Sequence, residues 1–166
     1  MNPTLTSAIL TALLITSAFG SQGRQPNFTG TWVLDKSGSE GLPPGTEQMM
    51  TISQTGDQLN LENKIRAPGG SISIFDTFII NGKEVAVTEK RNDDELKGKR
   101  VSKWLTDGNG FGSREELNAV GGDGLPVIQQ ITRKWLMAQD GKTFTVEADI
   151  TSPAGTQHTK RTFRKQ

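Results

Sequence analysis

The stretch 127–138 carries the residues best suited to bind a ligand. Gln129, Arg133 and Trp135 share one face of an alternating pattern whose other members are apolar. An Arg directed into an apolar interior needs a partner, and the acidic head group of a ligand would supply one. The alternative is that Arg133 reaches solvent at the mouth of the fold while its stem covers Trp135, which costs less than burial. Gln129 fits either interpretation, so these three residues are the candidate ligand site.

Residue types used in catalysis or metal binding are sparse. His158 is the single histidine and has no nearby nucleophile motif or metal-ligand spacing. Glu115 and Glu116 are adjacent in a strand-like segment, so they point to opposite faces and cannot act on one substrate bond. The loop at Asp107 begins like a calcium loop, but Asn118 stands where a bidentate Glu is required. We therefore expect no enzyme activity, no bound metal and no cofactor.

The composition argues against several kinds of partner and site. The chain has 19 Lys and Arg against 18 Asp and Glu, a formal net charge of +1, which gives no argument for a nucleic acid or an anionic membrane as partner. There is no Cys, so the protein has neither a thiol nucleophile nor a Cys metal site. Its stability must come from burial and backbone hydrogen bonds.

The elements that must position these residues are strands, because apolar and polar residues alternate along most of the chain. Turn pairs such as Asn81-Gly82 and Asp140-Gly141 separate the runs and favour tight hairpins. No helix of any length is evident. Short consecutive hairpins favour a single antiparallel up-and-down β-barrel of eight to ten strands over a sandwich. The predicted strands are 28–35, 47–54, 58–66, 71–80, 84–91, 98–106, 111–118, 127–138, 143–151 and 157–165.

The amino-terminal segment has the character of an export signal. Its apolar core, 9–15, is too short to span a bilayer, and small residues at Ala18 and Gly20 mark a cleavage site. We expect a signal peptide over 1–20, a short tail over 21–26 and a barrel domain over 27–166. This predicts a periplasmic or extracellular protein without an integral membrane segment after cleavage. With no Cys after the apolar core, it is not a lipoprotein.

Both ends of the predicted barrel resemble a known superfamily. The segment from Phe28 to Trp32, Phe-Thr-Gly-Thr-Trp, looks like the Gly-x-Trp start of the calycins, which include lipocalins, fatty-acid-binding proteins and avidins. The longer opening is similar to exported bacterial lipocalin-like proteins of unassigned function. The segment from Arg161 resembles the closing strand of fatty-acid-binding proteins. The resemblance implies that Trp32 plugs one end, with Arg161 or alternatively Arg164 packed across its indole.

The resemblance also implies a set of closing residues and a function. Gly30, Trp32, Arg161 and Phe163 would close the barrel. The chain departs from fatty-acid-binding proteins, because it lacks Tyr and room for a two-helix lid. We expect a non-enzymatic protein that binds a small, mostly apolar molecule entering opposite Trp32. The alternative is a filled barrel acting as a protein-interaction, inhibitor or envelope component, and the size of the interior cavity separates the two. The oligomeric state stays open.

Overall fold

The computed structural model describes residues 25–122, 124–153 and 155–166, and these residues form strands without any helix. The predicted signal peptide over 1–20 lies outside the described residues. Among the described residues there is no helix long and apolar enough to cross a membrane. The strands are β1 (Gly30–Glu40), β2 (Glu47–Thr55), β3 (Gln58–Ala67), β4 (Gly70–Ile79), β5 (Glu84–Arg91), β6 (Asp94–Trp104), β7 (Gly110–Val120), β8 (Pro126–Met137), β9 (Thr143–Ser152) and β10 (Gly155–Lys165).

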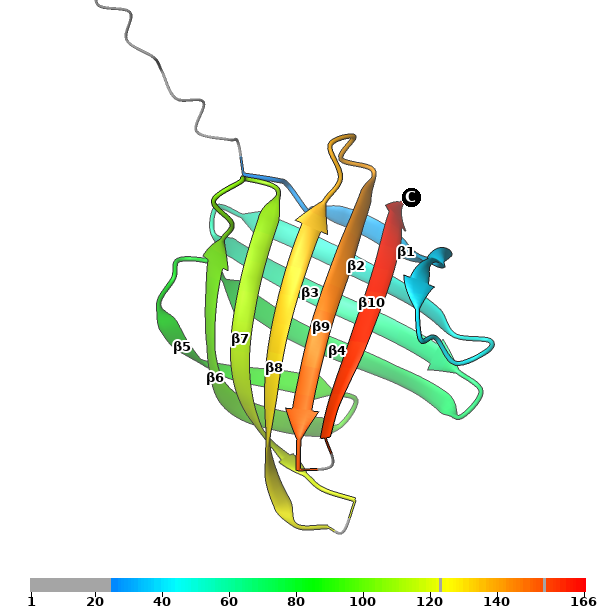
Figure 1. Ribbon diagram of the computed structural model, residues 1–166, viewed down its shortest axis with the longest axis vertical. Coiled ribbons are helices and arrows are strands. Elements are labelled where there is room, and N and C mark those ends of the chain that lie inside the picture. Colours follow the sequence, from blue (N-terminus) through cyan, green and yellow to red (C-terminus); the bar gives the residue numbers. More distant parts are fainter. Residues whose placement is uncertain (1–24, 123, 154) are drawn as a thin grey trace, which may run out of the picture.

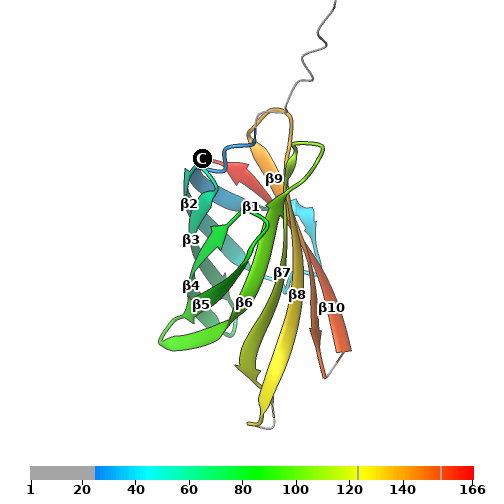
Figure 2. The same cartoon turned by 90° about the vertical axis from the view of Figure 1, so that its left-hand side faces the viewer.

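Each strand pairs antiparallel with its neighbours in the chain, and β1 pairs with β10 to close the sheet. In Figure 1, β6–β10 form one wall, and β1–β4 cross behind it at a steep angle. Figure 2 shows the same two walls from the side, with β2–β4 facing β7 and β8. The predicted all-β, single antiparallel up-and-down barrel is therefore confirmed, with ten strands.

Two strands differ from the predicted ranges for local reasons. β1 continues to Glu40, because its register with β10 shifts after Asp35 and lets Thr162 Oγ1 donate to the Gly38 carbonyl at 2.7 Å. β6 begins at Asp94, which pairs with Arg91 of β5. This tight connection is possible because Asn92 adopts a positive φ of 51°, which Asn tolerates better than most residues.

The wall is not evenly paired around its circumference. β4 and β5 are joined only at Ile74 with Arg91 and at Phe75 with Lys90. β1 and β2 pair over four positions and then separate beyond Val33. Elsewhere the ladders are long, as in the ten-residue pairing of β3 with β4. The barrel thus has two seams where its backbone groups need other partners.

The end of the barrel that contains Trp32 is filled with aromatic rings, and we call it the closed end. Trp135 lies between Phe111 and Phe144, with ring centroids 5.3 and 5.6 Å away, and Phe144 stacks on Phe163 at 5.0 Å. All four rings are buried. Offset stacked and edge-to-face contacts of this kind add to the free energy gained from burying the rings. The closed end is therefore a solid core.

Trp32 is fully buried, and its indole N–H donates to the Phe28 carbonyl at 2.8 Å. The cation over its ring is Lys165, with Nζ 5.2 Å from the ring centroid. The expected pairing with Arg161 or Arg164 was wrong. Arg164 pairs with Asp35 on the outer face, at 2.6 Å, and Arg161 donates to the Glu40 carbonyl. The reason is register, because Trp32 lies opposite Lys165 in the ladder of β1 with β10.

The opposite end, which we call the open end, is built differently. Its inward-facing residues belong to the same strand faces as the core. Val87, Leu117 and Ile131 form a second buried cluster there, whereas the inward-facing residues nearest the mouth remain partly exposed. They are mostly aliphatic, with Gln129 among them. The aliphatic members are Ile65, Ile72, Ile74, Leu96, Val127 and Ile150.

Candidate functional site

Between the two ends, the barrel interior contains charged side chains from neighbouring strands. Asp76 of β4, Glu89 of β5, Arg100 of β6 and Glu115 of β7 all point inward and are buried. Each occupies an inward position in the period-two pattern, between residues that are themselves directed inward. Buried charges of this kind are costly unless they are paired. We call this group, together with Arg91 and Arg133, the interior charge network.

Arg100 is the centre of the interior charge network. Its guanidinium donates to both oxygens of Asp76, at 2.9 and 2.6 Å, and to Glu115 at 2.7 Å. It also lies over the Phe78 ring, 4.0 Å from the centroid, at the boundary with the closed end. A fork of donors fixed by two carboxylates and one ring has little freedom to move. Arg100 therefore ties β4, β6 and β7 together inside the barrel.

Arg133 and Arg91 complete the interior charge network on the side of the open end. Arg133 pairs with Glu115 and lies 3.8 Å from a Glu89 oxygen, while Arg91 donates to Glu89 at 2.5 Å. The Ser113 hydroxyl donates to Glu115 at 3.0 Å. Three carboxylates thus meet three guanidinium groups, and the formal charges cancel.

The two acids that share Arg100 are shifted in opposite directions. Burial raises the pKa of Asp76 above its ordinary value, and Arg100 only partly opposes this effect. Burial acts on Glu115 in the same sense, but the charges of Arg133 and Arg100 outweigh it and hold the pKa below its usual range. The difference follows from the number of partners, because Glu115 contacts two guanidinium groups and Asp76 contacts one.

Convergent carboxylates raise the question of a metal site. Oxygens of Asp76, Glu89 and Glu115 lie within 4.8 Å of one another, which is close enough to share one cation. Each of these carboxylates already has an Arg partner inside the barrel. The guanidinium groups therefore supply the positive charge that a metal would bring, and the network is better described as a balanced ion cluster.

The interior charge network also compensates for the seam between β4 and β5. Beyond Phe75 these strands no longer pair, which leaves the backbone of Thr77 without a strand partner on that side. Arg100 donates to the Thr77 carbonyl at 2.7 Å, and Asp76 accepts from the Thr77 N–H at 2.8 Å. The ion pair of Arg100 with Asp76 thus replaces the hydrogen bonds that a paired strand would give to Thr77. The N–H and C=O groups of Thr77 therefore both have a partner.

The three residues predicted as a ligand site do not lie together in one space. Trp135 is only 2% exposed and lies inside the aromatic core, so it offers no face to a ligand. Arg133 points inward as predicted, but its partner is Glu115 and not a ligand head group; its side chain keeps 16% exposure. Gln129 is partly exposed at the open end. The three predicted residues therefore lie in three different places: Trp135 in the aromatic core, Arg133 in the interior charge network and Gln129 at the open end.

Sequence reasoning missed Asp76, Glu89, Arg100 and Glu115. The available signal was an ionisable residue at an inward position of an alternating strand, such as Asp76 two residues from Phe78. Adjacent Glu115 and Glu116 do point to opposite faces, since one is buried and the other pairs with Lys99 outside. What alternation within one strand could not show is that carboxylates from three strands converge.

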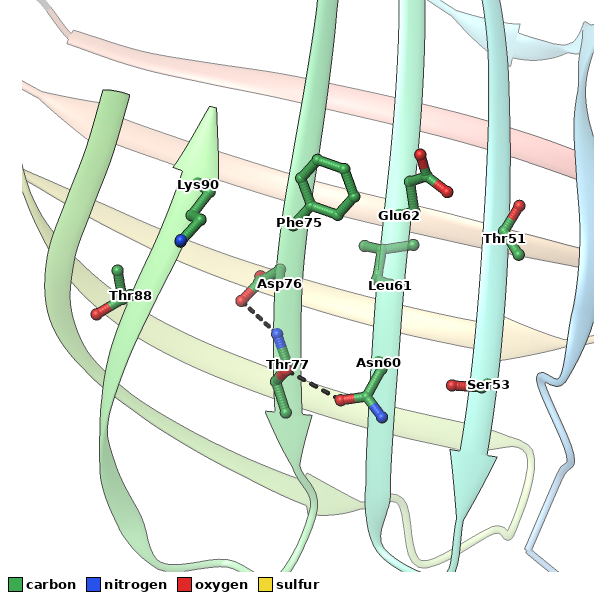
Figure 3. A pocket seen from close by; sticks show the side chains of 10 residues that line it. All are labelled: Thr51, Ser53, Asn60, Leu61, Glu62, Phe75, Asp76, Thr77, Thr88 and Lys90. Atoms are coloured by element: carbon green, nitrogen blue, oxygen red, sulfur yellow. Dashed lines mark hydrogen bonds between the residues drawn. The ribbon is translucent and has the colours of Figure 1, made fainter. Parts of the chain in front are cut away.

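Two hollows accompany these features. One, of about 440 Å³, lies over the seam between β4 and β5, and includes Asp76 in its lining (Figure 3). The other, of about 640 Å³, lies where β1 leaves β2. Its lining combines buried inward-facing residues, partly exposed residues of the open end and outward-facing residues of the wall. They are, in that order, Leu34 and Gln48, Ile65 and Ile72, and Met49 and Lys64.

Comparisons with known proteins add little to this geometry. No known protein family matches the chain, and neither does any curated protein. Among solved structures, the chain is similar to the zebrafish ileal bile acid-binding protein crystallised with cholic acid, at 15% identity and a TM-score of 0.41. The match covers 84% of this chain and 98% of that one. At this level the likeness carries no argument about the ligand, and the fold assignment rests on the strand pairing.

Proposed function

We propose that this barrel binds a small, mostly apolar molecule at its open end. One observation carries the proposal: the inward-facing aliphatic residues of the closed end are buried, whereas those nearest the mouth of the open end, around the buried cluster of Val87, Leu117 and Ile131, stay partly exposed. Exposed apolar side chains that line a concave surface gain free energy when a ligand covers them. The ligand would occupy the mouth only, because aromatic rings and the interior charge network fill the space below.

The 640 Å³ hollow supports this position. Its volume is in the range of small-molecule sites, and Leu34, Ile65 and Ile72 contribute to its lining from the inward face. Lys64 and Arg66 also contribute to its lining. An apolar body with a polar or acidic end would match such a lining better than a fully apolar molecule.

Arg161 is a cation beside the stretch of β1 that has left β2. It is partly buried, burial lowers the pKa of its guanidinium, and it donates to backbone carbonyls of Glu40 and Lys160. Unlike Arg133, it has no carboxylate partner among the described residues. It is therefore better placed than Arg133 to meet an acidic end of a ligand.

We also propose that the protein acts outside the cytoplasm, in the periplasm or the extracellular space. The apolar stretch 9–15 followed by Ala18 and Gly20 supports export, as does the compatibility of a barrel without Cys with an oxidising compartment. A fusion of residues 1–26 to a reporter enzyme would test this point, since export requires that the reporter be recovered outside the cytoplasm.

A titration with an environment-sensitive apolar probe, 1-anilinonaphthalene-8-sulfonate, tests the ligand site. Val127 and Ile128 are consecutive residues of β8, one facing the mouth and the other facing solvent. We expect Val127→Glu to weaken saturable probe binding at least about ten-fold, since a charge in the mouth must be desolvated by the ligand. Ile128→Glu should leave binding unchanged. Equal loss in both variants, or no saturable binding in the parent protein, would refute the proposal.

The second candidate function is a protein-interaction barrel. The observation in its favour is that the closed end and the middle of the barrel are filled by side chains. The same titration separates the two, because a protein-interaction barrel predicts no saturable binding of apolar probes at Val127. In that case the exposed apolar residues of the hairpin between β7 and β8, such as Val120 and Ile128, become the first surface to mutate.

A further inference from the structure

An exposed aromatic ring lies on the outer face of the wall, on the side of β4 opposite to that of the open-end residue Ile74. Phe75 of β4 points outward and is 46% exposed, and it is the one aromatic residue among the exposed large apolar side chains of the described residues. It lies in the 440 Å³ hollow over the seam between β4 and β5. The side chains around it are short and polar, so the ring is not covered by its neighbours. They include Thr51, Ser53, Asn60, Thr77 and Thr88.

The strand register sets the arrangement around the ring. Phe75 lies opposite Glu62 of β3 and opposite Lys90 of β5. Figure 3 shows the ring with Glu62 and Thr51 on one side and Lys90 on the other. The Thr77 hydroxyl donates to Asn60 Oδ1 at 3.0 Å, which fixes the orientation of the amide and leaves its N–H groups available as donors. A ring is thus surrounded by hydroxyl, amide and carboxylate groups.

The charges of this hollow are already balanced. Glu62 pairs with Lys64 at 2.9 Å, and Lys90 pairs with Glu95 at 3.5 Å. Neither charge is left to attract an ion of opposite sign. The hollow therefore favours an uncharged ligand that offers many hydrogen-bonding groups, and not an anion, a cation or a purely apolar molecule.

We propose that this hollow is a saccharide-binding site. A pyranose ring is uncharged, carries hydroxyl groups around its rim and presents C–H groups on one face. Those C–H groups would pack on the face of Phe75, whose π electrons attract the partly positive hydrogens. The hydroxyl groups would exchange hydrogen bonds with Asn60, Thr77 and Glu62. The hollow is large enough for a small molecule, and this site is independent of the ligand proposed at the open end.

The experiment is an NMR titration of the isotope-labelled protein with N-acetylglucosamine, maltose and cellobiose. We expect at least one of them to give saturable shifts at the backbone amides of Asn60, Phe75 and Thr77. Phe75→Ala should weaken that binding at least about ten-fold, as the loss of an aromatic packing partner does. Phe75→Leu should weaken it similarly, because leucine keeps apolar bulk without an aromatic face.

Two controls keep the test decisive. Ile128→Ala changes an apolar residue that is 57% exposed on β8, outside the hollow, and should leave saccharide binding unchanged. All variants are checked for folding by circular dichroism. Absence of saturable shifts with all three saccharides overturns the proposal, and so does binding that survives Phe75→Ala. Failure here leaves the anilinonaphthalene titration of the open end unaffected, since the two sites share no residue.

Discussion

At the closed end of the barrel, Trp32, Trp135 and Phe144 are packed ring against ring, whereas at the open end Ile72, Val127 and other aliphatic residues of the same inward faces meet solvent. The strands are the same, so alternation alone does not explain the contrast. What differs is residue size, because large aromatic rings meet across the barrel and fill it, and smaller aliphatic side chains do not. One end thus supplies stability, and the other is the end at which we propose that a ligand binds.

The largest loss of stability should come from truncating an aromatic side chain in the closed end. Phe144→Ala removes a fully buried ring that touches Trp32, Trp135 and Phe163, and we expect a loss of about 4 kcal/mol in the free energy of unfolding. Ile150→Ala, on the inward face of the same strand at the open end, should cost clearly less, because its side chain is already partly exposed. Urea unfolding measures both, and equal losses would contradict the contrast between the ends.

The second largest loss of stability should come from removing the central cation of the interior charge network. Arg100→Met leaves Asp76 and Glu115 without their shared partner, and we expect a loss of about 3–4 kcal/mol in the free energy of unfolding. Lys99→Met, one residue away on the outer face of β6, should have little effect because its ion pairs are exposed. Urea unfolding of the pair decides the point. If Arg100→Met left the free energy of unfolding unchanged, the interior charge network would not stabilise the seam between β4 and β5.

Glu115→Gln should make stability less sensitive to acid. The pKa of Glu115 is lowered in the fold, so its contribution is present in full above the ordinary value of 4.5 and is lost as the pH falls through the folded-state value. We expect a deficit of about 3 kcal/mol at neutral pH that narrows below pH 4.5. The pKa of Asp76 is raised in the fold, so ionisation of Asp76 makes the protein less stable as the pH rises, which is opposite to the effect of Glu115.

Stability curves against pH for the parent protein, Glu115→Gln and Glu116→Gln measure this difference. Glu116 is the matched control, since it is adjacent in β7 but faces solvent. Its replacement should leave the curve nearly unchanged. A deficit in Glu115→Gln that stays constant down to low pH would mean that Glu115 is not stabilised as a carboxylate.

The smallest effect concerns the cation at the floor of the barrel. Lys165→Met should shift the fluorescence of Trp32, because Lys165 lies over its ring, with only a small loss of stability. Arg161→Met should leave that fluorescence unchanged, since Arg161 contacts the Glu40 carbonyl instead. Emission spectra of both variants check the assignment. A shift caused by Arg161→Met alone would restore the pairing predicted from the sequence.

The fold could be predicted from the sequence because its signals are local. Alternation and turns such as Asp140-Gly141 placed all ten strands within a few residues, and Trp32 was correctly placed on β1 beside the last strand. The exact register was not accessible, because alternation fixes which face of the last strand points inward but does not decide which of two residues on that face, Arg161 or Lys165 four positions later, lies opposite Trp32. The irregular stretch of β1 after Asp35, where Thr162 Oγ1 donates to the Gly38 carbonyl, likewise leaves no mark in the alternation of the sequence.

The interior charge network was beyond local reasoning for another reason. Arg133 was recognised as an inward cation, but its partner comes from a different strand, Glu115 of β7, and the network also needs Asp76 and Glu89. Convergence of side chains from β4 to β8 depends on how the barrel closes, which no single alternating segment encodes. The sequence does show one inward-facing acid in each of three strands, Asp76, Glu89 and Glu115. These acids could have indicated that inward-facing Arg residues already have carboxylate partners.

An NMR titration of the labelled protein with 1-anilinonaphthalene-8-sulfonate tests the contrast between the two ends most directly. We expect saturable shifts at the backbone amides of mouth residues such as Val127, Gln129 and Ile150, with the amides of Trp135 and Phe144 unchanged. Shifts centred on Trp135 and Phe144, or no saturable shift at all, would contradict it.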